Sequence, residues 1–156
     1  MYEEKFMKEA VALSEQCLSL EQGGPFGAVV VKDGKIVGRG RNMVTVNNDP
    51  TAHAEVMAIR NACKNLNTFQ LTECDIYSSC EPCPMCLGAI YWARPKHLYF
   101  AADREQASLA GFDDSFIYHE LTLPYSERKI PTERHLYSDA GLVLENWKHN
   151  ERKIEY

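Results

Sequence analysis

Two short groups of residues combine metal-binding and acid–base side chains. The first is His53, followed two positions later by Glu55. The second is the pair Cys83 and Cys86, set in the string Pro-Cys-Pro-Met-Cys that begins at residue 82. A Pro-Cys-x-x-Cys string arises by chance in on the order of one per cent of shuffled chains of this composition. We therefore treat the two groups as candidate functional residues.

The cysteine pair has the spacing of metal ligands. We expect Cys83 and Cys86 at the point where a strand runs into a helix with Pro84 in its first turn, since proline is tolerated there. Two thiolates one helical turn apart can point at one ion, and the N-terminus of a helix favours anionic sulfur. These features predict that both cysteines bind the same metal ion.

One histidine and two cysteines give zinc three protein ligands and leave the fourth tetrahedral position to water. His53, Cys83 and Cys86 therefore predict one catalytic Zn²⁺ per chain. Zinc lowers the pKa of bound water to about 7, so a hydroxide nucleophile exists at neutral pH. Glu55 lies near the metal but can stay outside its ligand set, where it can shuttle protons. Attack on an amidine-like carbon with loss of ammonia is hydrolytic deamination.

The cysteines leave two other interpretations open. A Cys-x-x-Cys string can form a redox pair, as in thioredoxin-like proteins, although such motifs need no upstream His-x-Glu. A structural zinc site would need a fourth ligand, for which Cys80, His97 and Cys74 are the candidates. Cys17 and Cys63 fall on apolar helix faces, where we expect small core residues.

The hydrophobic spacing predicts an alternating α/β chain. We expect helices at residues 3–21, 53–66 and 84–93, the second capped by Thr51, and strands at 27–32, 35–40, 75–79 and 96–101. This order predicts a sheet with helices on both faces. Further on we expect helical pieces within 103–122, a loop bracketed by Pro124 and Pro131, a strand or a helix within 136–147 and a charged tail at 148–156.

Composition favours a small-molecule substrate. The chain has 17 Lys and Arg against 22 Asp and Glu, a net charge of −5, and because affinity for polynucleotides comes largely from phosphate neutralisation we expect no nucleic acid partner. No apolar run approaches the roughly 20 residues that span a bilayer, and the first residues lack the features of a secretory signal. We therefore expect no membrane association and a cytoplasmic location, where clustered cysteines bind metal in preference to forming disulfides.

The combination of His-Ala-Glu with Pro-Cys-x-x-Cys in an alternating α/β chain resembles the zinc-dependent cytidine/deoxycytidylate deaminase superfamily. The resemblance covers about residues 23–102. It implies a three-layer α/β/α fold with a central five-stranded mixed sheet, and a single deaminase domain over residues 1–156. In that domain the catalytic core takes about 1–120 and a C-terminal segment about 121–156.

Four strings further resemble the bacterial guanine deaminases of this superfamily: residues 23–28, 48–55, 80–94 and 111–118. This resemblance implies hydrolysis of guanine to xanthine and ammonia. Other substrates stay open, namely cytosine, a cytidine nucleotide, adenosine in tRNA or a triazine-type amine. A non-catalytic zinc-binding module is the alternative of another class.

The same resemblance implies further site residues and a partner. Asp114 shares proton transfer with Glu55, and the implied substrate-binding residues are Phe26, Asn42, Ala54, Trp92 and Tyr156. It also implies a homodimer in which the C-terminal segment is exchanged between subunits. Core packing of the aromatic residues, a loop position for Asn42 and helix capping by Asp114 are the structural alternatives.

Overall fold

The structure is a computed structural model that describes all of residues 1–156, and it divides into two compact units, Met1–Asp114 and Ser115–Tyr156. The helices of the first unit are α1 (Glu4–Ser19), α2 (Val44–Asn47), α3 (Ala54–Leu66), α4 (Pro84–Ala93) and α5 (Arg104–Leu109). Its strands are β1 (Gly27–Lys32), β2 (Lys35–Arg41), β3 (Cys74–Cys80) and β4 (His97–Ala102). The second unit contains α6 (Ser115–Thr122), the short 3₁₀ helix η1 (Tyr125–Glu127) and α7 (Tyr137–Lys148).

The four strands form one mixed sheet in the order β2-β1-β3-β4. β1 pairs antiparallel with both β2 and β3, whereas β3 and β4 are parallel. Asp33 and Gly34, which join β1 to β2, both have positive φ (50° and 69°), as the tight hairpin turns that match strand twist require. The parallel strands β3 and β4 are connected through α4, so the chain passes from the carboxyl end of β3 to Cys83, the N-cap residue of that helix.

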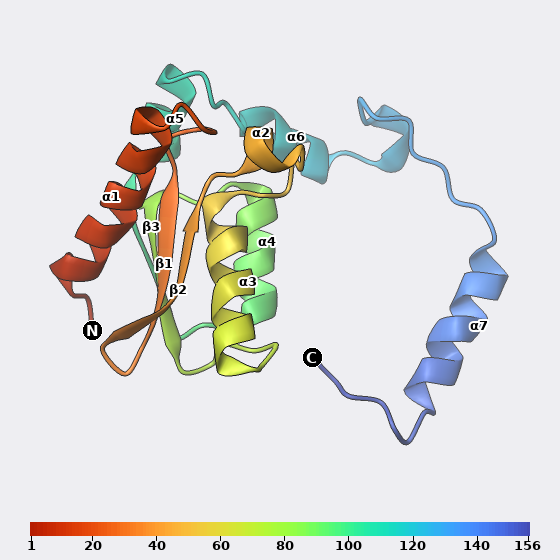
Figure 1. Cartoon of the computed structure of the whole chain (residues 1–156). Helices are drawn as coiled ribbons and strands as arrows, with labels where there is room; N and C mark the ends of the chain where they lie inside the picture. Colours follow the sequence, from red (N-terminus) through yellow and green to blue (C-terminus); the bar gives the residue numbers. More distant parts are fainter. The chain divides into compact units, whose positions relative to one another are not determined.

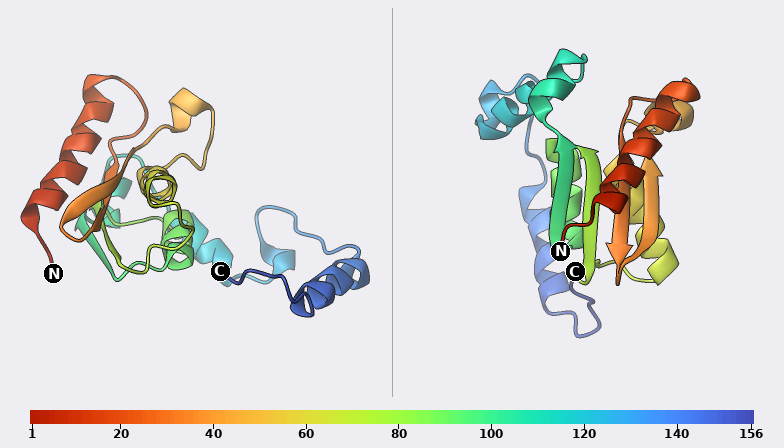
Figure 2. Two further views of the ribbon diagram at one scale, coloured as in Figure 1. Left: turned by 60° about the horizontal axis from the view of Figure 1, so that its bottom comes forward. Right: turned by 90° about the vertical axis from the view of Figure 1, so that its left-hand side faces the viewer.

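Helices cover both faces of the sheet and make the first unit three-layered (Figure 1, Figure 2). α1 packs on one face, where Phe6, Ala10 and Leu13 are buried against Val29 and Tyr77. α3 and α4 pack on the other face, where their buried residues are the small Ala54, Ala58, Ala62 and Ala93 together with Ile90. The predicted α/β/α arrangement is therefore confirmed.

The strand number and the cap of one helix differ from the predictions. The expected five-stranded sheet is wrong, since the sheet has four strands and the chain continues after Ala102 as helices. The segment 136–147, left open between strand and helix, lies in α7. Thr51 does not cap α3, because His53 is the N-cap residue and the Thr51 hydroxyl donates to Asp49 over 2.7 Å. The short helix α2 was not predicted.

The second unit has no buried residue in any of its three helical segments. α7 nevertheless carries large apolar side chains, of which Leu142, Val143 and Leu144 are each more than 60% exposed. A unit of this size without a buried core lacks the main source of folding free energy. No helix of the protein has both the length and the apolar composition needed to cross a membrane.

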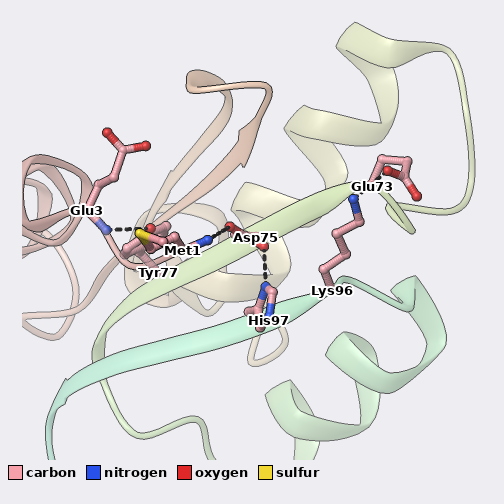
Figure 3. A network of polar contacts seen from close by, with 7 residues as sticks. All are labelled: Met1, Glu3, Glu73, Asp75, Tyr77, Lys96 and His97. Atoms are coloured by element: carbon pink, nitrogen blue, oxygen red, sulfur yellow. Dashed lines mark hydrogen bonds and ion pairs between the residues drawn. The ribbon is translucent and has the colours of Figure 1, made fainter.

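Polar contacts attach the start of α1 to the sheet (Figure 3). The Glu3 backbone N–H donates to the Tyr77 hydroxyl over 3.0 Å. Two residues further up β3, Asp75 contacts His97 Nδ1 on β4 at 2.9 Å, and the N-terminal ammonium group lies 3.9 Å from the same carboxylate. These contacts place α1 over the β1–β3 pair. They also hold His97 at the amino end of β3, whereas Cys83 and Cys86 follow its carboxyl end.

The approach of α3 to β2 depends on two glycines. A Cβ atom at Gly38 would lie 2.5 Å from the Ala58 carbonyl oxygen. A Cβ atom at Gly40 would overlap the Ala54 carbonyl oxygen and the Ala58 backbone nitrogen. Backbone atoms cannot move aside as a flexible side chain can, so α3 can lie at this distance only because these positions lack side chains.

We expect Gly40→Ala to destabilise the protein by about 1–3 kcal/mol or more, the usual cost of overpacking a close contact. Thermal or urea unfolding monitored by circular dichroism measures the effect. Gly88→Ala in α4 is the matched control, because a Cβ atom there meets nothing within 4 Å and alanine favours helix by about 0.5–1 kcal/mol. Equal stabilities for the two variants would show that the α3–β2 approach does not depend on Gly40.

Candidate functional site

The predicted metal ligands lie together in the structure. His53, Cys83 and Cys86 form a group whose ligand atoms all lie within 4.8 Å of one another. His53 Nδ1 is 3.6 Å from Cys83 Sγ and 3.4 Å from Cys86 Sγ. Segments thirty residues apart in the sequence therefore present one nitrogen and two sulfur atoms to the same point.

Two helix N-termini position these three side chains. His53 is the N-cap residue of α3 and Cys83 is the N-cap residue of α4, with Pro84 at the first helical position as expected. Cys86 follows in the first turn of α4. The backbone N–H groups at a helix N-terminus are partly positive, so they stabilise thiolates held beside them.

The spacing of the donor atoms fits a tetrahedral zinc ion. Zinc–nitrogen bonds of about 2.0–2.1 Å and zinc–sulfur bonds of about 2.3 Å at tetrahedral angles put nitrogen and sulfur about 3.5 Å apart. The observed separations of 3.6 and 3.4 Å agree with this value. One imidazole and two thiols are also ligand types that zinc prefers. The group can hold one Zn²⁺ ion with a coordination position left for a ligand from solvent.

The three ligand groups are strongly coupled electrostatically. Hydrogen bonds from Cys86 and then His53 lower the pKa of the Cys83 thiol to about 4. The hydrogen bond with Cys83, followed by burial, raises the pKa of Cys86 far above its ordinary value. The hydrogen bond with Cys83 also raises the pKa of His53. Without metal the cysteines thus share one proton, which a cation displaces when it binds.

The proposed structural zinc site with four protein ligands finds no support in this arrangement. Cys80, Cys74 and His97 are not members of the ligand group. Burial raises the pKa of the Cys80 thiol to about 11, and its Sγ lies 3.7 Å from the Asp103 carbonyl oxygen. His97 is engaged by Asp75, as described above (Figure 3).

Glu55 lies one residue inside α3 and is only 6% exposed. Its Oε1 accepts a hydrogen bond from the Ser78 hydroxyl over 3.2 Å, which ties the carboxyl group to β3. Burial raises the pKa of Glu55. A carboxyl group with a raised pKa takes up a proton more readily than an ordinary carboxylate, which suits a general acid–base group.

A cavity of about 380 Å³ opens beside the ligand group. His53, Glu55 and Cys83 line it together with three other predicted site residues, Phe26, Asn42 and Asp114. The volume lies at the small end of the range of about 300–1,000 Å³ for ligand pockets. A mostly apolar cavity with a few converging polar groups is the usual form of a small-molecule site.

Asn42 and Phe26 are held next to each other at the end of the β1–β2 pair. The Asn42 backbone N–H donates to the Phe26 carbonyl oxygen over 3.0 Å, and Asn42 is only 5% exposed. Its side-chain Oδ1 accepts from the Val44 backbone N–H over 3.1 Å in α2. That bond fixes the amide with one oxygen lone pair in use, which leaves its NH₂ group for a ligand.

Three predicted site residues do not line this cavity. Ala54 is 1% exposed within the core on the α3 side of the sheet. Trp92 lies on α4 and is 64% exposed. Tyr156 belongs to the second unit and is 66% exposed.

Sequence reasoning missed several residues of the site. Ser78 had no motif around it, although it is the residue that holds Glu55. Glu81 and Arg104 also line the cavity, and they are joined by a hydrogen bond from the Arg104 backbone N–H to Glu81 Oε2 over 3.2 Å. Phe112 precedes Asp113 and Asp114 in one of the strings quoted above, and that proximity was the only signal for it.

Comparison with known proteins places these features in a family. Residues 1–102 match the family described as the cytidine and deoxycytidylate deaminase zinc-binding region. A guanine deaminase from Bacillus subtilis is 53% identical over 156 residues, which cover 100% of both chains. A tRNA-specific adenosine deaminase from Haemophilus influenzae is 40% identical over 126 residues, covering 77% of this chain and 72% of that one.

Solved structures agree with this assignment. The X-ray structure of the Bacillus subtilis guanine deaminase has a TM-score of 0.95 and covers 100% of this chain and 99% of that one at 53% identity. A guanine deaminase from Nitrosomonas europaea has a TM-score of 0.68 at 31% identity, covering 72% of this chain and 65% of that one. The family match includes the His–Cys–Cys group, and together they support one Zn²⁺ per chain. The chain belongs to the cytidine and deoxycytidylate deaminase zinc-binding family.

Proposed function

We propose that the protein is a zinc-dependent deaminase that hydrolyses guanine to xanthine and ammonia. The observation that carries the proposal is the His53–Cys83–Cys86 group beside the buried carboxyl group of Glu55, at the wall of a cavity of about 380 Å³. Identity of 53% over the whole length of a guanine deaminase supports guanine above the other bases. The tRNA-specific adenosine deaminase from Haemophilus influenzae is less similar, at 40% identity.

His53, Cys83 and Cys86 hold the zinc ion in this proposal. Bound zinc supplies a nucleophile at neutral pH by lowering the pKa of water to about 7. Glu55 accepts the proton of the attacking water and returns protons to a ring nitrogen and to the leaving amine. The C2–N bond of guanine breaks, a C2–O bond forms, and one water is consumed for each ammonia released.

Phe26 and Asn42 position the base. The Phe26 ring offers an apolar face on which a planar purine can stack, and the free NH₂ group of Asn42 can donate to a ring acceptor. Asp114 is the second acid–base group. Burial, followed by the negative charge of Cys83, raises its pKa, which suits a carboxyl group that exchanges protons with a ring nitrogen or the amine.

We also propose a homodimer in which the C-terminal segment is exchanged, so that Tyr156 of one chain and Trp92 help to close a pocket. The absence of any buried residue from the helical segments of the second unit supports this, because its apolar side chains then need another surface. Trp92 and its neighbour Tyr91 are 64% and 75% exposed on α4. The whole chain then acts as one deaminase domain.

The cytoplasm is the proposed location. All six cysteines are free thiols in the structure, and Cys83 and Cys86 must remain reduced to bind zinc.

Replacing Glu55 separates zinc binding from turnover. We expect Glu55→Gln to keep about one zinc per chain and to lose ammonia release from guanine by roughly 100-fold or more, the usual contribution of general acid–base catalysis. Metal analysis and an ammonia assay measure the two properties, with adenine, cytosine, cytidine and deoxycytidylate as parallel substrates. Cys86→Ser is the matched control, which should lose zinc as well. Zinc loss in Glu55→Gln would instead make Glu55 a ligand.

The buried carboxyl group of Glu55 also makes the metal-free protein less stable as pH rises. Its native pKa is raised by burial above the ordinary 4.5, so the native state holds more protons than the unfolded state as pH passes through that interval. Stability is therefore lost above about pH 4.5. We expect metal-free Glu55→Gln to become increasingly more stable than wild type as the pH rises from 4 to 8, measured by urea unfolding. Parallel stability curves would contradict the raised pKa.

Subunit exchange predicts complementation between two inactive chains. One carries Glu55→Ala with an intact tail, and the other has an intact core but lacks Tyr156. In a mixed, exchanged dimer the intact core receives the intact tail, so mixing after unfolding and refolding should restore guanine turnover to up to about a quarter of the wild-type rate per chain if pairing is random. Sedimentation velocity measures the dimer itself. A dimer without restored turnover would exclude the exchanged arrangement.

A further inference from the structure

A second cavity of about 340 Å³ lies next to the candidate substrate pocket. It is lined mainly by small apolar side chains from the α1 side of the sheet and from α5, among them Val11, Ala101 and Ala110. Four residues line both cavities: Phe26, Cys80, Ala107 and Phe112. These four side chains therefore form a common wall between the two spaces.

The aromatic pair is the bulky part of that wall. The rings of Phe26 and Phe112 meet edge to face, with centroids 4.9 Å apart and planes at 84°. Both rings pack against the backbone of Gly24, where an added Cβ atom would lie 3.0 Å from an atom of each ring. Phe112 thus fills the space between the Phe26 ring and α5.

The end of α5 fixes the position of Phe112. The Phe112 backbone N–H donates to the Ala107 carbonyl oxygen over 2.9 Å, and the Gly111 N–H donates to Ser108 over 2.9 Å. Gly111 has a φ of 93°, which completes the Schellman motif that commonly ends a helix. In such a motif the residue after the glycine contacts the last turn of the helix, and here Phe112 and Ala107 share the wall.

The beginning of α5 is fixed as well. Asp103 and Gln106 form a reciprocal capping box, in which the Asp103 carboxylate accepts from the Gln106 N–H over 2.8 Å. The Arg104 backbone N–H donates to Glu81, and the Glu81 N–H donates to the Ala102 carbonyl oxygen at the end of β4. The helix that carries Phe112 is therefore held at both ends.

We propose that Phe112 is a specificity-determining residue, which limits the pocket to an unsubstituted planar base by separating it from the second cavity. The proposal rests on the proposed deamination of guanine. A base stacked on Phe26 lies in a cavity that the perpendicular Phe112 ring also lines, so a substituent directed at that ring meets the wall. Truncation of Phe112 joins the two cavities and gives the substituent room.

The test compares guanine with 7-, 8- and 9-methylguanine in the zinc-loaded wild type and in Phe112→Ala. One methyl group in an apolar pocket changes kcat/KM by roughly 10–200-fold. We expect wild type to prefer guanine, and Phe112→Ala to narrow that preference by about ten-fold or more for at least one methyl isomer. Phe112 is 44% exposed, so the variant should fold, which its thermal unfolding checks. Unchanged ratios for all three isomers would overturn the proposal.

Two further variants distinguish loss of the wall between the cavities from a general loosening of the packing around Phe112. Val11→Ala enlarges the second cavity from α1 without touching the wall and should leave the preference at the wild-type value. Ala110→Phe added to Phe112→Ala refills the second cavity and should restore the preference. A purely structural role for Phe112 would lower the rates with all bases equally and would not be rescued by Ala110→Phe.

Failure of the proposed function can be distinguished from failure of the wall proposal, because wild type would then release no ammonia from guanine. In that case equilibrium binding of guanine and the methylguanines to the same zinc-loaded variants, measured by isothermal titration calorimetry, tests the wall alone. The proposal is supported if the affinity for a methylguanine, divided by the affinity for guanine, is higher in Phe112→Ala than in wild type. Identical relative affinities, or no binding of any base to either protein, overturn it.

Discussion

The site depends on the convergence of two helix N-termini. His53 is the N-cap residue of α3 and Cys83 is the N-cap residue of α4. Both helices pack on the same face of the sheet, so their first turns meet. The convergence requires α3 to lie almost in contact with β2, which Gly38 and Gly40 permit. A thiolate and a buried carboxyl group then share a region where helix dipoles favour negative charge. The geometry of the metal ligands is thus a consequence of backbone packing.

The balance of charge in the site links metal binding by the two cysteines to proton transfer by Glu55. Without metal, Cys83 and Cys86 share a proton, and burial raises the pKa of Glu55 so that a further negative charge is costly. A dication relieves the repulsion among these groups, so metal binding and the ionisation of the site stabilise each other. Ser78 keeps Glu55 pointing from α3 toward β3. The ligand group and the proton-transfer group are therefore assembled by one electrostatic arrangement.

Local patterns in the sequence predicted the elements, and contacts between distant segments decided the rest. Pro84 and the cysteine spacing correctly placed the start of α4, because proline chemistry is local. The prediction that Thr51 caps α3 was wrong, because its hydroxyl donates to Asp49 instead. The predicted fifth strand, also wrong, was implied only by the family resemblance. Phe112 could not be identified as part of a wall, since that role depends on Phe26, more than eighty residues away. The functional roles of the lining residues remain predictions.

Phe112 follows the end of α5, a helix that is held in position by hydrogen bonds. α5 has six residues and none is buried, so it is too short to be stable alone and gains little from the core. The stability that packing does not give α5 comes from its capping box, its Schellman motif and its hydrogen bond to Glu81. A side chain held in this way can change size without opening a void in the main core. The architecture therefore places substrate selection on an element whose substitution disturbs neither the sheet nor the ligand group.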